Sequence, residues 1–180
     1  MNLHAEMTEA ADAAARTVGN VDASQFGRPT PCADWDVRTL LNHLIVWTSY
    51  SLEARAHGDS VGQDLIDRDF AADPGFAADY RAQLDRALTA WSAPATWEGS
   101  LNVMGSPTPA ADVAALNIAE MVLHGWDLAA ATGQTYTVGE PAASAALEAG
   151  ARGIARPLAI VGPCGMSRPK SSRTSPLTAS

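Results

Sequence analysis

The chain of 180 residues fits one domain with a hydrophobic core, and apolar residues make up 47% of it. No apolar run approaches the roughly 18–20 residues of a membrane span, and the N-terminus lacks the layout of a secretory signal, so we expect a cytoplasmic protein with no membrane partner. Residues 6–148 hold all 20 acidic residues and seven basic ones, and this net charge of −13 argues against a nucleic-acid partner.

Two helices are predicted in the first third of the chain. Apolar residues from Leu3 to Val21 recur at helical intervals and predict a helix over residues 3–20. After a loop rich in proline and glycine, Asp36 is a good N-cap for a second helix over residues 37–57.

Three further helices are predicted beyond an acidic loop. The third begins after Pro74 and continues to Trp91. The fourth covers residues 110–131 and ends at a glycine, and a shorter fifth covers residues 141–155.

The connections carry no convincing β-sheet pattern. The loop at residues 59–73 has room for a short helical turn, and residues 101–104 could form a short extended piece. Four long amphipathic helices with modest connections predict an all-α protein, an up-and-down four-helix bundle with a short additional C-terminal helix.

The fourth helix carries a polar stripe on an otherwise apolar surface. Asn117, Glu120, His124 and Asp127 follow one another at steps of three, four and three residues, so they share one face. The stripe contains no lysine or arginine, although a solvated face usually carries some. We therefore expect it to point into the protein.

An inward stripe of this kind favours a metal site. A buried, unpaired glutamate costs on the order of several kcal/mol, and a divalent ion is a good partner for it. Glu120 and His124, one helical turn apart, have Cβ atoms about 5–6 Å from each other. His43, on a mostly apolar face of the second helix, is the candidate third ligand, and Asp127 is a candidate to orient an imidazole or hold a water.

A rival pair has the same spacing. Glu53 and His57 lie near Arg55 and Asp59 at the end of the second helix, and His57 is about 21 Å from His43 along the axis at 1.5 Å per residue. We interpret this pair as exposed charge rather than as metal ligands.

The remaining side chains of note are expected to be structural. Trp35, Trp47 and Trp126 fit the core or the wall of a pocket better than a cofactor contact. Cys32 lies in the loop that enters the second helix, and we expect no catalytic or ligand role for it. The two cysteines are too few for a zinc site made of cysteine alone.

Two segments carry a family resemblance. "TPCADWDVRTLLNHL" and "AEMVLHGWDLAAATGQ" closely resemble the paired motifs of the mycothiol-dependent maleylpyruvate isomerase metal-binding domain, within the DinB/YfiT-like superfamily, and the similarity covers roughly residues 5–155. The resemblance implies a four-helix bundle with an open divalent-metal site whose ligands fall on His43, Glu120 and His124. Members are often transferases or isomerases that use a small thiol such as mycothiol, and many others have no assigned reaction.

Such a ligand set suits catalysis better than a structural role. Two neutral imidazoles and one carboxylate leave a divalent ion with a net charge near +1 and an open position. Coordination would deprotonate a thiol and hold the thiolate beside an electrophile. Zn²⁺ is the first choice, with Ni²⁺ and Fe²⁺ as alternatives.

Three classes of function stay open. The protein is a mycothiol-dependent S-transferase or isomerase with a small-molecule thiol and an electrophilic substrate as partners, a non-catalytic metal-binding protein related to stress, or a bundle for protein association. A homodimer is compatible with each class. The sequence names neither a substrate nor a catalytic residue.

The end of the chain departs from the family pattern. From residue 149 onward there are five basic residues and no acidic one, a net charge of +5, whereas relatives often finish with an acidic and apolar segment. We therefore divide the chain into a metal-binding bundle at residues 1–156 and an atypical tail at residues 157–180. The tail is either a disordered extension or the product of a shifted reading frame.

Overall fold

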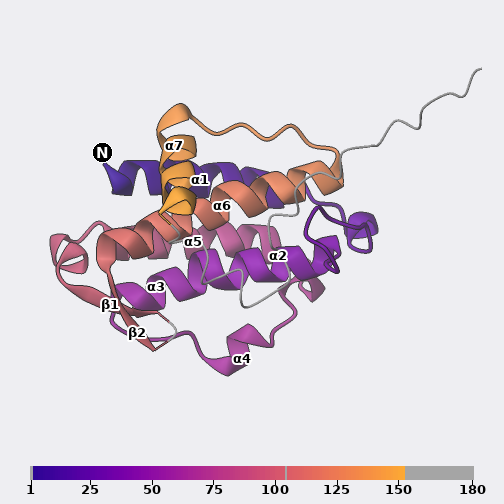
Figure 1. Cartoon of the computed structure of the whole chain (residues 1–180). Helices are drawn as coiled ribbons and strands as arrows, with labels where there is room; N and C mark the ends of the chain where they lie inside the picture. Colours follow the sequence, from indigo (N-terminus) through magenta and orange to yellow (C-terminus); the bar gives the residue numbers. More distant parts are fainter. Residues whose placement is uncertain (1, 104, 153–180) are drawn as a thin grey trace, which may run out of the picture.

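The computed structural model describes residues 2–103 and 105–152, which are mostly helical with one small sheet (Figure 1). In chain order the elements are α1 (Leu3–Gly19), α2 (Val37–Ile45), α3 (Ser51–Ala56), α4 (Gln63–Ile66), α5 (Phe76–Trp91), β1 (Ser100–Val103), β2 (Ser106–Pro109), α6 (Ala110–Thr132) and α7 (Glu140–Ala151). Short 3-10 helices cover Ala23–Gln25, Phe70–Ala72 and Pro94–Trp97. No helix in this described part is long and apolar enough to cross a membrane.

The long helices begin and end where the sequence predicts. The Asp36 side chain accepts a hydrogen bond from the Thr39 amide (2.8 Å) and caps α2. Gly133 ends α6 in the left-handed conformation, with a φ of 76°, which a residue with a side chain rarely adopts. The tail expected at residues 157–180 and the expected end of the fifth helix lie outside the described residues.

The predicted second helix is not a uniform α-helix. A π-helical segment, Val46–Tyr50, joins α2 to α3. Within it, the Thr48 and Ser49 hydroxyls donate to the carbonyls of Leu44 and Ile45, both at 2.6 Å, and such bonds disturb the regular ladder. The π turn takes up one extra residue, so every side chain of α3 is rotated relative to an uninterrupted helix.

The small sheet is a departure from the expected all-helical pattern. β1 pairs antiparallel with β2 from Ser100 opposite Pro109 to Val103 opposite Ser106. The expected extended piece overlaps β1, but β2 reads "SPTP", whose two prolines and lack of apolar alternation gave no strand signal.

α6 is the central helix of the protein. It packs against α1, α2 and α7, while α5 packs against α1 and α3, so α1, α6, α2–α3 and α5 form a closed ring. α7 lies across α1 and α6 (Figure 1). Buried alanines at these contacts, such as Ala10 and Ala14 of α1 and Ala142 and Ala145 of α7, let the helix backbones approach closely. This position encloses the polar stripe of α6 within the ring.

Candidate metal centre

The polar stripe of α6 faces the interior. Glu120 is 6% exposed and His124 is 9% exposed. Elsewhere on the helix, Leu123 is 43% exposed and Trp126 is 55% exposed. Trp126 therefore does not lie in the core, because two residues beyond His124 a side chain points to the opposite side of a helix.

Three predicted ligands come together inside the ring. The Glu120 carboxylate oxygen Oε2 lies 3.1 Å from Nε2 of His43 on α2 and 3.3 Å from Nε2 of His124, one turn further along α6. One donor atom from each residue can be chosen so that all lie within 4.8 Å of one another. The structure thus brings together two imidazole nitrogens and one carboxylate oxygen from two different helices.

Aromatic rings cover this cluster. The His43 and His124 rings meet edge to face, with centroids 4.9 Å apart. The Trp35 ring lies 4.8 Å from the His43 ring and 6.0 Å from the His124 ring, and the Trp47 ring lies 6.4 Å from the His43 ring. Trp35 and Trp47 are therefore walls of the site, as expected.

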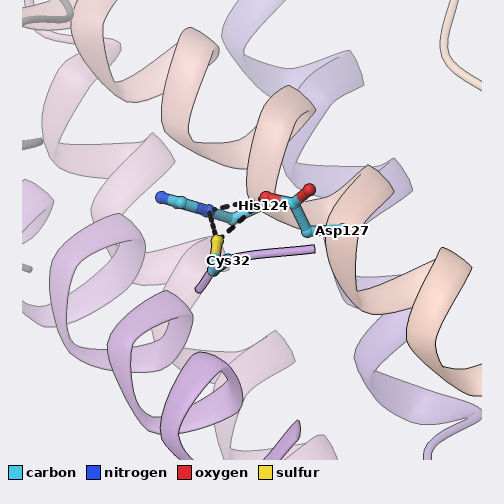
Figure 2. A group of neighbouring side chains, drawn as sticks. All are labelled: Cys32, His124 and Asp127. Atoms are coloured by element: carbon cyan, nitrogen blue, oxygen red, sulfur yellow. Dashed lines mark hydrogen bonds and ion pairs between the residues drawn. The ribbon is translucent and has the colours of Figure 1, made fainter. Parts of the chain in front are cut away.

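A second group shares His124 (Figure 2). The Cys32 sulfur lies 3.7 Å from Nδ1 of His124 and 3.3 Å from Oδ2 of Asp127, which is itself 3.2 Å from the same nitrogen. These three residues also have donor atoms close enough to hold an ion. The helical spacing predicted the place of Asp127. No local pattern in the sequence predicts that Cys32, 92 positions before His124, lies beside it.

The loop that carries Cys32 is tied into one shape. The Thr30 hydroxyl donates a hydrogen bond that is shared between the carbonyl of Cys32 (3.1 Å) and the carbonyl of Trp35 (2.9 Å). The Thr30 backbone amide also donates to the Trp35 carbonyl. Asp34 has a φ of 67°, an unusual backbone conformation for a residue other than glycine. This turn delivers both Cys32 and Trp35 to His124.

The charges of the cluster depend on one another. Burial alone would lower the pKa of His124, but its bonds to Asp127 and Glu120 raise that pKa to about 9. Burial would raise the pKa of Glu120, yet the two imidazoles hold it at about 2. Burial lowers the pKa of His43. Without an ion, the protein therefore holds an ionised Glu120 between a protonated His124 and a neutral His43.

The donor set fits a divalent ion. Two imidazole nitrogens and one carboxylate oxygen are the ligands that Zn²⁺ takes in three-ligand sites, and they leave one position open. His124 can offer Nε2 to this set because its other nitrogen, Nδ1, faces the Asp127 carboxylate at 3.2 Å. An acceptor at that position fixes the tautomer and orientation of a ligating histidine.

The rival pair has other partners. His57 is exposed just beyond α3. Glu53 accepts a hydrogen bond from Gln83 and lies 3.9 Å from Arg86. Within the described residues this pair belongs to no group with metal-binding geometry. Arg55, which the sequence grouped with these helix-end charges, is instead buried.

Two further polar side chains, those of His4 and Asn117, serve the fold. Nε2 of His4 lies 3.0 Å from the Leu88 carbonyl oxygen. The amide of the buried Asn117 donates to the Val113 carbonyl of its own helix (2.9 Å). His4 belongs to no group with metal-binding geometry among the described residues.

The packing of Tyr136 explains why a glycine, Gly125, follows His124 in the motif "HGWDL". A Cβ atom at this position would lie 2.8 Å from the Tyr136 ring, closer than real side chains approach. The Tyr136 hydroxyl donates to the Met121 carbonyl (3.0 Å), which holds the ring against α6.

Comparisons with known proteins agree with this geometry. A family model described as the mycothiol maleylpyruvate isomerase N-terminal domain matches residues 7–129, which include His43, Glu120 and His124. Two relatives described as uncharacterized proteins, from two strains of Mycobacterium tuberculosis, are each 28% identical over 174 residues, covering 89% of this chain and 87% of their own. No solved structure matches the chain significantly.

Proposed function

Because the chain belongs to the mycothiol maleylpyruvate isomerase N-terminal domain family, we propose that it binds a divalent metal ion and uses a small thiol, mycothiol, in transferase or isomerase chemistry. His43, Glu120 and His124 are the proposed ligands, with Zn²⁺ as the first choice and Ni²⁺ or Fe²⁺ as alternatives. The ring of α1, α6, α2–α3 and α5 is then the family's up-and-down four-helix bundle, with α7 as the additional helix.

One observation carries the proposal. Three donor atoms of the types that bind zinc converge from two helices, within 4.8 Å of one another, in the buried interior. A purely structural explanation would need another reason to bury two imidazoles and a carboxylate together, since burying charge is unfavourable unless the charge is paired.

The residues around the cluster have distinct parts in this chemistry. A bound divalent ion would supply a thiolate at neutral pH by coordinating the sulfur at its open position. Glu120 provides the negative charge that favours a cation, and Asp127 keeps the His124 ring oriented by accepting from Nδ1. The Trp35 and Trp47 rings exclude water from one side of the cluster, which strengthens the electrostatic interactions inside it.

The test is spectroscopic and needs no knowledge of the substrate. The full chain is loaded with Co²⁺, whose absorption reports its ligands, and mycothiol is added. We expect a new thiolate-to-metal absorption band in the parent protein. The Glu120→Gln variant should lack it, and His57→Ala is the matched control that should keep it, because His57 is exposed and outside the cluster.

Two results would redirect the proposal. Binding of Co²⁺ without any change on addition of mycothiol would favour the non-catalytic metal-binding alternative. Absence of Co²⁺ binding in the folded parent protein would contradict the metal proposal altogether, and would leave a role in protein association.

A further inference from the structure

Arg55 is a buried cation to which the proposed thiol chemistry assigns no role. It lies on α3, only 6% exposed, and its Nη1 atom has no hydrogen-bond partner among the described residues. A buried group of this kind costs free energy unless something pairs with it, and arginine keeps its charge at all ordinary pH values. An anion beside Arg55 would offset this cost.

The π-helical segment turns Arg55 towards the face that carries His43. α3 continues the line of α2 (Figure 1). In an uninterrupted α-helix, two residues 12 positions apart point about 120° away from each other. Val46–Tyr50 absorbs one extra residue, which reduces this angle to about 20°. His43 and Arg55 thus lie on one face of the combined helix, and that face is turned to the interior.

The electrostatics agree with this placement. Burial lowers the pKa of the Arg55 guanidinium, and the negative charge of Glu120 opposes that effect. Arg55 is therefore within the electrostatic reach of the ligand cluster without belonging to it. Along the axis, its Cα lies roughly 16–17 Å from that of His43, and its long side chain leans back towards the start of the helix.

We propose that Arg55 receives the carboxylate of the molecule that reacts at the His43, Glu120 and His124 cluster, an inference that rests on the proposed function. The substrate class is then an electrophile with a carboxylate group held several ångströms from its reacting atom. The planar guanidinium can donate two parallel hydrogen bonds to such a group.

A carboxylate suits this position better than a phosphate does. One carboxylate neutralises one guanidinium, so no net charge stays buried. A phosphate carrying two negative charges would leave one of them unpaired in the interior of the bundle, where an unpaired charge is costly.

Small anions test the site on metal-free protein, so the result does not depend on the metal proposal. The full chain is stripped of metal with 1,10-phenanthroline, a chelator without a carboxylate. Its thermal unfolding is then followed against acetate, against the neutral isostere acetamide and against inorganic phosphate, all at constant ionic strength. We expect saturable stabilisation by acetate, and none by acetamide or phosphate.

Substitutions identify the residue. Arg55→Met removes the charge at similar length and should weaken acetate binding at least about tenfold, the usual consequence of losing a charged hydrogen bond. Arg55→Lys keeps the charge but loses the two-point contact, so it should weaken acetate binding by a smaller factor. Arg68→Met is the matched control, since Arg68 is exposed and pairs with Asp73 at 4.0 Å; it should respond to acetate like the parent.

The inference is overturned if acetate stabilises Arg55→Met or Arg55→Lys as strongly as the parent. It is also overturned if phosphate stabilises the parent while acetate does not. If Co²⁺ fails to bind but the acetate effect depends on Arg55, the metal proposal has failed while the carboxylate site stands.

Discussion

Two Glu–His pairs with the same four-residue spacing lie in very different surroundings. Glu120 and His124 are buried on α6, and Nε2 of His43, on α2, lies 3.1 Å from the Glu120 carboxylate oxygen Oε2. Glu53 belongs to α3, and His57 follows it in solvent. The spacing alone is therefore no sign of a metal site.

The partners of each pair explain the difference. Glu53 is satisfied by Gln83 and lies near Arg86, so its charge is already paired by residues of α5. Among the described residues, the hydrogen-bond and ion-pair partners of the Glu120 carboxylate are imidazoles, which are good metal ligands as well as hydrogen-bond donors. Burial and a third donor from a second helix distinguish a candidate metal centre from a surface ion pair.

The largest effect is expected for His43→Ala. This change removes a proposed ligand on α2 without touching α6. It should lower Zn²⁺ affinity at least about a hundredfold, more than the loss of a residue that only orients a ligand. Competition with a chromophoric chelator measures the affinity. Unchanged affinity in a folded variant would mean that α6 binds the ion without α2.

Asp127→Asn should have an intermediate effect. The amide keeps the size of the side chain but removes the charge that faces Nδ1 of His124, so Zn²⁺ affinity should fall about 10–100-fold. The ligands themselves remain, so the stoichiometry should stay that of the parent. A variant as tight as the parent would show that Asp127 does not orient His124.

The pH dependence of the metal-free protein probes the buried pair. The pKa of His124 is raised from 6.5 to about 9 by Asp127 and Glu120. The stability that comes from this raised pKa is fully present below pH 6.5 and is lost as the pH rises through 9. His43 and Cys32 also contact the His124 ring. Because the pKa of His43 is lowered from 6.5, its titration affects stability below pH 6.5 and not between pH 6.5 and 9.

Urea unfolding between pH 6 and pH 9.5 measures this loss. The parent should become less stable across the range, and His124→Gln should remove most of the slope. A stability that rises from pH 6.5 to 9 in the metal-free parent would contradict the assigned protonation of the cluster.

The smallest effect is expected for His57→Ala. Because this side chain is exposed and lies outside both groups with metal-binding geometry, Zn²⁺ affinity and stoichiometry should equal those of the parent. Calorimetric titration of the two proteins side by side checks this. A loss of binding here would show that the wrong pair has been chosen.

Periodicity and caps predicted most of the helical framework and the cluster. The polar stripe of α6 can be recognised in the sequence because its polar residues recur at helical spacing among apolar ones. The glycine at position 133 predicts the end of the helix. His43 could be chosen because it stands alone on an apolar face. These features depend on residues close in sequence or on helical spacing.

Other features depend on tertiary contacts that local patterns do not encode. The π turn coincides with the hydroxyl bonds of Thr48 and Ser49, and within it the Thr48 hydroxyl also contacts that of Tyr80 on α5 (2.7 Å). The place of Cys32 depends on how its loop folds back against α6. The burial of Arg55 follows from the π turn itself, so a sequence reading based on a regular α-helix misplaces it.

The most direct test makes the same change in both pairs. Glu120→Gln and Glu53→Gln each replace a carboxylate with an amide of nearly the same shape. Zn²⁺ titration of both variants, with circular dichroism as the folding control, compares them with the parent. We expect Glu120→Gln to bind Zn²⁺ at least about a hundredfold more weakly than the parent, and Glu53→Gln to bind like the parent. Equal binding by both folded variants would contradict it.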